Sequence, residues 1–389
     1  MLKVFSAIVA VTLLLLTGTV AAQPACQLVL DAGSSGTRLY LYQFQQHRWQ
    51  SIAGPHTVAL ADPVRQQRGK TTADIASTAQ AIATSLTRFR HDGPAKADGT
   101  PRWHGLDWQS ACRLQAVSVY ATAGMRLAEQ QHPQAAAALW QAVKNAIREK
   151  VGPGVAIQAR TLSGFEEGLY AWLAVSYRQQ RQDLGIVEMG GASSQVAFPC
   201  PACNTSDDAL RTVRIGGQPV PFYSYSFLGL GQDEAPKRLG LPASCQYDAA
   251  QHQPDWHLAL CQDLIRLRRG NSIIDPANYH DGHYAGARQV PVARSAVKQW
   301  YLTGAFKYLK ADQVQRCCQH QGQCYNQQTA CYRAAYLPKY LSVLGIPDTA
   351  KVADASWTLG AAICQQDHCL AAAQPLRCRW SKNGCIARP

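Results

Sequence analysis

The feature that most constrains this chain is a strand, carboxylate and glycine-turn pattern that occurs twice. Residues 28–38 read Leu-Val-Leu-Asp-Ala-Gly-Ser-Ser-Gly-Thr-Arg, and residues 186–195 read Ile-Val-Glu-Met-Gly-Gly-Ala-Ser-Ser-Gln. Glycine lets the backbone approach an anion closely, so that successive N–H groups converge on it, and Ser and Thr hydroxyls add donors. The repeat therefore predicts a duplicated domain with a nucleotide polyphosphate clamped between its halves.

The two loops supply candidate phosphate ligands, which are Ser34, Ser35, Gly36 and Thr37 in the first loop and Gly190, Gly191 and Ala192 in the second. Asp31 and Glu188 follow the apolar runs at equivalent positions, where a carboxylate suits a hydrated divalent cation. Ser193 and Gln195 are candidates for holding a water molecule. For either loop alone, an ordinary hairpin turn is the alternative.

A third motif, Ser163-Gly-Phe-Glu-Glu-Gly168, lies at a predicted helix start. Ser163 and Glu166 fit a capping box, in which the third helical side chain folds back on the cap. That gives Glu166 a structural role and leaves Glu167 free, and in a phosphohydrolase Glu167 would be the general base. From this motif alone, two acidic residues favoured by the helix dipole are the simpler interpretation.

A fourth motif, Ala121-Thr-Ala-Gly-Met-Arg126, follows a predicted strand and precedes a predicted helix. Small residues allow close approach here, and Thr122 offers a hydroxyl toward a cleft. Arg126 is expected in a salt bridge that orients the loop, with phosphate binding as the alternative. The chain has no Gly-x-Ser-x-Gly sequence, which argues against a Ser/His/Asp hydrolase.

The N-terminal sequence and the composition indicate the cellular compartment of the protein and the charge of its ligand. Residues 1–22 predict a cleaved secretion signal, and a membrane anchor is the alternative, although the apolar run is short for a span. Fourteen cysteines then predict disulfides, and for Cys200 and Cys203 ordinary disulfide bonding, with partners left open, is favoured over half a zinc site or a redox motif. The net charge of +13 favours acidic ligands, but the scattered Lys and Arg residues do not predict a nucleic-acid site.

Apolar periodicity predicts alternating strands and helices. We expect helices over 72–90, 133–151 and 164–177, strands over 114–120 and 155–162, a second hairpin over 185–198, and helical segments near 294–310, 329–344 and 355–364. This order indicates a two-domain α/β protein with a central cleft. We expect an N-terminal lobe over 23–160, to which the chain returns near 355–389, and a C-terminal lobe over 161–354 with disulfide-rich insertions.

In order and spacing, these motifs resemble the apyrase-conserved regions of the ecto-nucleoside triphosphate diphosphohydrolases. Residues 31–38, 121–126, 163–172 and 188–195 are similar to the first four regions, and Trp357-Thr-Leu-Gly-Ala361 resembles the fifth. The resemblance implies a two-lobed, actin-like (ribonuclease H-like) α/β fold with duplicated mixed sheets and a central cleft. It also implies hydrolysis of the terminal phosphates of nucleoside tri- and diphosphates to the monophosphate, with Mg²⁺ or Ca²⁺.

The resemblance assigns roles residue by residue. It makes Glu167 the base, with Ser193 and Gln195 positioning the attacking water, and it places Asp31 and Glu188 around the metal through water. Arg38 joins the first phosphate loop, Thr122 lies near the terminal phosphate, and Tyr308 is implied to stack on the base, with Tyr336 in a later base-site segment.

Glu188 departs from the family, which usually has Asp there, and the longer side chain leaves the metal preference open.

We expect a secreted (extracellular or periplasmic) protein without a stable membrane anchor. Alternatives are an exopolyphosphatase-like phosphohydrolase or a kinase of the same superfamily, or a non-catalytic nucleotide-binding or host-interaction protein. Base preference, disulfide pairing and oligomeric state stay open.

Overall fold

The computed structural model describes residues 23–65, 74–90, 96–97, 103–107, 112–203, 209–246, 256–277, 279–280, 283–284, 286–310, 318, 327–371, 378–381 and 384–387. The predicted secretion signal lies outside these residues. Within them, no helix is both long enough and apolar enough to cross a membrane.

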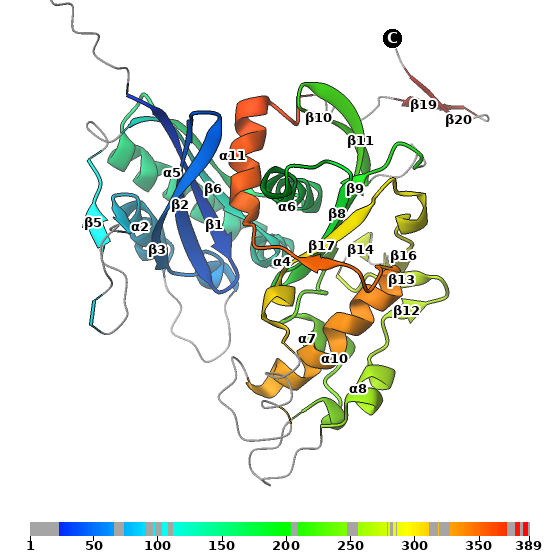
Figure 1. Cartoon of the computed structure of the whole chain (residues 1–389). Helices are drawn as coiled ribbons and strands as arrows, with labels where there is room; N and C mark the ends of the chain where they lie inside the picture. The colour runs from blue at the N-terminus through cyan, green and yellow to red at the C-terminus, as the bar shows by residue number, and fades with distance from the viewer. Residues whose placement is uncertain are drawn as a thin grey trace, which may run out of the picture.

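Two mixed sheets dominate the molecule (Figure 1). The first has the order β3-β2-β1-β6-β7, with β1 Ala25–Gly33, β2 Gly36–Gln45, β3 Arg48–Thr57, β6 Arg113–Ala121 and β7 Ala156–Thr161. The second has the order β10-β11-β9-β8-β17-β18, with β8 Leu184–Met189, β9 Ser193–Pro199, β10 Leu210–Ile215, β11 Gln218–Leu228, β17 Gln299–Gly304 and β18 Lys351–Val352.

The two sheets are built on the same plan. In each, an antiparallel hairpin (β1–β2 or β8–β9) continues into a third antiparallel strand, and parallel strands lie on the other side. The register also repeats, because Asp31 faces Arg38 across β1–β2 and Glu188 faces Gln195 across β8–β9. The predicted duplication of the mixed sheets is thereby confirmed at the level of individual residue pairs.

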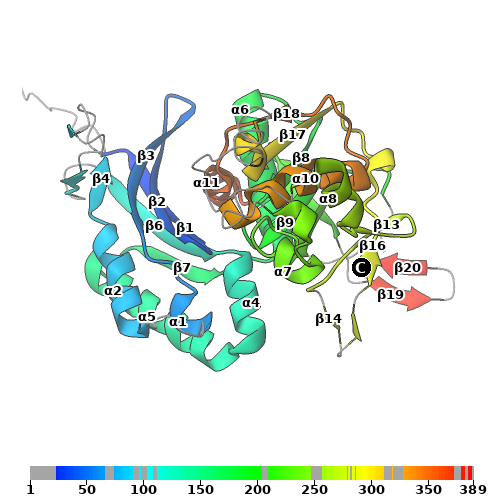
Figure 2. The same ribbon diagram turned by 90° about the horizontal axis from the view of Figure 1, so that it is seen from below.

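Helices α6 (Gly164–Gln179) and α11 (Trp357–Asp367) lie between the sheets, as Figures 1 and 2 show from two directions. A continuous apolar core joins Val29 of the first sheet, Trp172 of α6, Ala362 of α11 and Ile186 of the second sheet. Burying such side chains contributes about 1.5–3 kcal/mol each. The core therefore fixes both sheets against the same pair of helices.

Local sequence explains the best-predicted helices. Helix α5 (Pro133–Val151) begins with proline at its first turn, buries one apolar stripe and ends before Gly152, whose φ is 81°. Helix α6 begins at the predicted capping box, in which Ser163 and Glu166 satisfy each other's backbone N–H groups. These bounds match the sequence prediction closely.

The predicted helix near 294–310 is wrong. Its central part is strand β17, followed by a 3₁₀ turn over Ala305–Tyr308. Trp300, Tyr301 and Leu302 are all buried, because β17 lies between β8 and β18 and is covered on both faces. A strand of this kind is a continuous apolar run that periodicity cannot distinguish from a helix. The predicted helix over 72–90 is also shorter, since α2 ends at Ser85.

The remaining elements are α1 Asp62–Arg65, α2 Ile75–Ser85, β4 Arg88–Arg90, β5 Trp103–Gly105, α4 Ala123–Gln131, α7 Ala235–Leu239, α8 Leu258–Leu264, β12 Arg268–Arg269, β13 Ser272–Ile274, β14 Tyr279–His280, β15 His283–Tyr284, β16 Ala287–Arg288, α10 Gln327–Leu344, β19 Cys378–Ser381 and β20 Gly384–Ala387. Disulfides join Cys26–Cys112, Cys200–Cys203, Cys245–Cys261, Cys318–Cys331 and Cys364–Cys369. The division of the chain into lobes stays a prediction.

Candidate active site

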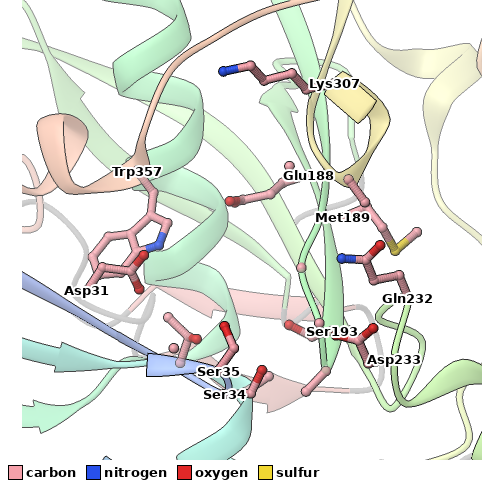
Figure 3. A pocket seen from close by; sticks show the side chains of 18 of the residues that line it. Asp31, Ser34, Ser35, Glu188, Met189, Ser193, Gln232, Asp233, Lys307 and Trp357 are labelled. Atoms are coloured by element: carbon pink, nitrogen blue, oxygen red, sulfur yellow. The ribbon is translucent and has the colours of Figure 1, made fainter. Parts of the chain in front are cut away.

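A cleft of about 950 Å³ lies where the tips of the two hairpins meet. Figure 3 shows Asp31, Ser34 and Ser35 of the first hairpin facing Glu188 and Ser193 of the second across this space. The tips approach closely, because a Cβ placed on Gly191 would lie 2.8 Å from Ser34 Oγ. The structure therefore brings the two predicted phosphate loops to one site.

Most predicted site residues line this cleft, namely Asp31, Ser34, Ser35, Arg38, Thr122, Glu167, Glu188, Gly190, Gly191, Ala192, Ser193 and Tyr308. Three do not, which are Gly36, Thr37 and Gln195. The Thr37 hydroxyl is buried and donates to the carbonyl of Val58, so it is turned toward the sheet edge. Gln195 lies behind the cleft surface and donates a hydrogen bond to Ser193, which lines the cleft.

The second loop is held from behind by the backbone of residues 229–234. N–H groups of that segment donate to the carbonyls of Gly190, Gly191 and Ala192 at 2.8–3.1 Å. Gly231 lies so close that a Cβ there would be 2.4 Å from backbone atoms of the loop. Because N–H and C=O point in opposite directions in a trans peptide, the loop's N–H groups are turned away from the segment. Convergent backbone N–H groups of this kind bind anions.

Among the described residues, no backbone segment supports the first loop in this way, and charged side chains flank it instead. Arg38 Nη1 lies 3.6 Å from Asp31 Oδ2 across the hairpin, and its side chain is 46% exposed. Burial raises the pKa of Asp31 to about 6, even though Arg38 acts to lower it. The loop tip also approaches the start of α4, where Gly124 leaves room for Ser34.

Thr122 precedes α4 and lines the cleft. Its hydroxyl does not cap the helix, since no hydrogen bond joins it to the first turn. A helix N-terminus presents unpaired N–H groups and favours an anion. The residues following Thr122, Ala123 and Gly124, also line the cleft.

Glu167 is buried at the start of α6 and is held by Arg126. Arg126 Nη2 donates to Glu167 Oε2 at 2.5 Å and to Ser193 Oγ at 3.2 Å, and Arg126 Nη1 donates to Ser226 Oγ at 3.0 Å. The expected salt bridge of Arg126 is present, with Glu167 as its partner. Gln195 Nε2 donates to Ser193 Oγ at 2.6 Å and to Ser226 Oγ at 2.9 Å. These contacts join four elements, α4, α6, β9 and β11, around the carboxylate of Glu167.

The neighbouring Glu166 has a different environment. It caps the helix and pairs with Arg160 at 2.6 Å, and its pKa is lowered because these contacts outweigh burial. Burial raises the pKa of Glu167 to about 7, against the effect of Arg126. At neutral pH, Glu167 can therefore take up a proton, whereas Glu166 stays ionised.

Glu188 completes a set of three carboxylates with Asp31 and Glu167. Burial, and then repulsion from the other two, raises the pKa of Glu188 well above its usual value. Its Oε2 atom is buried without a hydrogen-bond partner among the described residues. In that part of the chain, no three His, Cys, Asp or Glu side chains lie close enough to ligate a metal directly. A cation held through water fits these carboxylates, because it would compensate their repulsion.

Tyr308 is 71% exposed at the rim of the cleft, beside the ion pair of Lys307 with Asp354 at 2.7 Å. An exposed aromatic face suits stacking against a planar ring. Tyr336 is fully buried and donates to the carbonyl of Leu230, so it does not line the cleft. The implied base-site role of Tyr336 is not supported by this position.

Several lining residues were missed by sequence reasoning. Asp233 and Arg333 form an ion pair at 3.6 Å in the cleft, and His56 lines it on the opposite side. Glu234 connects the two halves, because Arg65 of α1 donates to its Oε1 at 3.2 Å. The Gly231-Gln-Asp-Glu234 segment carries no periodicity, and its glycine and two acidic residues are the only sequence signal that could have pointed to a site.

Known proteins provide an independent comparison. The family model of the GDA1/CD39 (nucleoside phosphatase) family matches residues 108–335. The chain is 30% identical over 233 residues to human ectonucleoside triphosphate diphosphohydrolase 2, covering 54% of this chain and 43% of that protein. It is 28% identical over 292 residues to the bovine ectonucleoside triphosphate diphosphohydrolase 1, covering 65% and 51%. The chain spans about half the length of the curated relatives it matches.

Solved structures agree on the fold. Nucleoside triphosphate hydrolases from Neospora caninum superpose with a TM-score of 0.53 at 15% identity, covering 88% of this chain and 92% of that one. An Aquifex aeolicus PPX-GPPA enzyme gives a TM-score of 0.50 at 13% identity, covering 87% and 99%. At such identities the likeness concerns the fold alone, which is the two-lobed, actin-like α/β fold predicted from the motifs.

Proposed function

The chain belongs to the GDA1/CD39 nucleoside phosphatase family, and we propose that it hydrolyses the terminal phosphates of nucleoside tri- and diphosphates to the monophosphate. The observation that carries this proposal is the buried Glu167, which shares Arg126 with Ser193 in the cleft where the two glycine-containing loops meet. Its raised pKa suits a general base at neutral pH.

In the proposed reaction, Glu167 takes a proton from a water molecule held by Ser193. The water oxygen forms a bond to the terminal phosphorus, and the bond from that phosphorus to the bridging oxygen breaks. The electron pair stays on the departing nucleotide, and inorganic phosphate is the other product. Gln195 and Arg126 hold Ser193 and Glu167 in place, and no phosphorylated protein is formed.

The two loops bind the phosphate chain before and during this step. The N–H groups of Gly191 and Ala192 and the hydroxyls of Ser34 and Ser35 contact phosphate oxygens, and Thr122 contacts the terminal phosphate. Asp31 and Glu188 would hold Mg²⁺ or Ca²⁺ through its water shell, and the ion would neutralise negative charge on the phosphates. Tyr308 stacks on the base of the nucleotide.

The compartment is part of the proposal. We propose that residues 1–22 are removed and that the protein is secreted, which the disulfides support. N-terminal sequencing of protein recovered outside the cytoplasm tests this. A mature chain that begins at Gln23 is expected, and a retained Met1 would contradict the proposal.

The central experiment compares Glu167→Gln with Glu166→Gln. Phosphate release from ATP and, separately, ADP is measured with Mg²⁺ and with EDTA. Losing a general base commonly costs about 10²–10⁴-fold, so Glu167→Gln should lose most turnover while still binding nucleotide. Glu166→Gln keeps a capping residue and should retain most turnover. Near wild-type turnover in Glu167→Gln would overturn the assignment.

A further inference from the structure

His56, near the end of β3, lies on the cleft face of the first sheet. It faces Arg38 across β2–β3, and Arg38 in turn faces Asp31 across β1–β2. Directly opposed residues in antiparallel strands present their side chains on the same face. Asp31, Arg38 and His56 therefore form a row that lies beside the phosphate loop.

The second sheet has the same row at equivalent positions. Glu188 faces Gln195, and Gln195 faces Ser226. In that row, the hydroxyl of Ser226 accepts hydrogen bonds from Gln195 and Arg126, so it belongs to the hydrogen-bonded cluster around Glu167. His56 is exposed and lines the cleft, so its position leaves it open to a ligand.

The imidazole of His56 lies against Gly36 in the first loop. A Cβ placed on Gly36 would be 2.0 Å from Nε2 of His56 and 2.7 Å from Cε1. The ring thus fills the volume that a side chain at position 36 would occupy, immediately after Ser34 and Ser35. Glycine at this position makes room for a side chain that reaches the loop from a different strand.

The other basic side chains of the cleft already have carboxylate partners. Arg38 pairs with Asp31, Lys307 with Asp354 and Arg333 with Asp233. Within the described part of the chain, His56 has neither an ion pair nor a hydrogen bond. An imidazole N–H is a hydrogen-bond donor in either protonation state.

We propose that His56 binds the phosphate chain of the substrate, donating an imidazole N–H to a phosphate oxygen held at the first loop. The identity of the ligand rests on the proposed function, whereas the placement of the ring beside the loop does not. His56 is thus a binding residue, and it is separate from the proton transfer at Glu167.

The test compares His56→Leu, which removes the donor, with His56→Gln, which keeps an N–H at a similar reach. KM and kcat are measured for ATP and ADP, and the Kd of inorganic pyrophosphate with Mg²⁺ is measured by calorimetry. His56→Leu should raise both KM and the pyrophosphate Kd by about tenfold, as for one lost hydrogen bond to a charged group, with kcat unchanged. His56→Gln should recover most of this loss.

His47, in the turn between β2 and β3, provides a matched control for His56 on β3. His47 is exposed in the β2–β3 turn at a φ of 60°, outside the cleft, and asparagine tolerates that backbone conformation. His47→Asn should leave KM and Kd unchanged. Unchanged values in His56→Leu, or equal losses in His56→Leu and His56→Gln, would overturn the proposal, since equal losses indicate packing.

The pyrophosphate measurement separates this proposal from the proposed hydrolysis. If wild type releases no phosphate but binds pyrophosphate more tightly than His56→Leu does, the hydrolysis fails and the His56 assignment stands. If wild type hydrolyses ATP and both proteins bind pyrophosphate equally, only the His56 assignment fails. If wild type neither hydrolyses ATP nor binds pyrophosphate, both fail.

Discussion

The two hairpins share strand order, register and turn chemistry, yet they prepare for an anion in different ways. The second is supported from behind, since backbone N–H groups of 229–234 donate to its carbonyls. In the part of the chain that the structure describes, no segment backs the first hairpin in this way, and Arg38 and His56 lie beside it. In the second hairpin, the position of Arg38 is taken by the fully buried Gln195.

This difference separates two ways of binding phosphate. Backbone dipoles fixed in a buried loop need no rearrangement when charge develops on a substrate. An exposed cationic side chain such as Arg38 attracts an anion over a longer range, but salt screens this attraction. We therefore expect the second hairpin to control turnover and the first to control affinity.

The largest effect is expected from Gly231→Ala. Its Cβ would lie 2.4 Å from three backbone atoms of the second loop, so the loop must shift. Overpacking of this kind costs about 1–3 kcal/mol in stability. Displaced N–H groups should also lower kcat for ATP by about 10²-fold, as when one such donor is lost. Phosphate release and thermal unfolding measure the two effects.

Gly33→Ala is the counterpart in the first hairpin. Its Cβ would meet Gly36 O at 3.4 Å, which is ordinary contact. We expect kcat and the unfolding temperature to stay near those of wild type. If Gly33→Ala lowers kcat as much as Gly231→Ala does, the contrast between a buttressed and an unbuttressed loop is lost.

The next effect concerns the pH dependence of stability that arises from the carboxylates of Glu188 and Asp31. In the folded protein the pKa of Glu188 is raised well above 4.5, the usual value that we take for the unfolded chain. At pH values between the unfolded-state and folded-state pKa, the folded state therefore binds more protons than the unfolded state. In EDTA, wild type should therefore lose stability relative to Glu188→Gln as pH rises above 4.5. At pH 8 we expect Glu188→Gln to be more stable by about 1–3 kcal/mol, the cost of an unsatisfied buried polar group.

Asp31→Asn should show a smaller gain, because Arg38 already compensates that carboxylate. Thermal unfolding from pH 4 to pH 8, with EDTA and then with Mg²⁺ or Ca²⁺, measures both variants. Added metal should stabilise wild type more than Glu188→Gln. A Glu188→Gln protein that is less stable than wild type at pH 8 in EDTA would contradict the prediction.

The smallest effect is expected from Arg38→Gln, which copies the residue at the equivalent position of the second hairpin. The side chain is half-exposed, so the free energy of unfolding should change by less than about 1 kcal/mol. KM for ATP should rise by about tenfold at low salt. The dependence of KM on salt, measured from low to high NaCl, should become weaker than in wild type. An unchanged salt dependence would show that Arg38 does not attract the substrate.

Much of the fold was predictable because its signals are local. The two carboxylate–glycine turns, the capping box at Ser163 and the proline at the start of α5 each fix structure within a few residues. Strand β17 was not predictable from its own pattern, since its burial depends on β8 and β18, which are distant in the chain.

The site shows the same limit. Glu167 could be chosen over Glu166 because the capping box is a sequence feature. The support of the second loop by Gly231 and the reach of His56 to Gly36 both depend on sheet register, which no short motif encodes. Thr37 was assigned to the loop from its neighbours, but its hydroxyl bonds to Val58 on the adjoining segment.

The ion pair between Arg65 and Glu234 ties the second loop to the opposite half of the molecule. Glu234 donates its backbone N–H to Gly191 and accepts a hydrogen bond from Arg65 with its side chain. The two halves can move apart only as far as the side chains of Arg65 and Glu234 can extend, unless their ion pair breaks or Glu234 moves. Opening of the cleft would therefore either break the Arg65–Glu234 pair or displace Glu234, and a displaced Glu234 would release the loop from its backbone hydrogen bond.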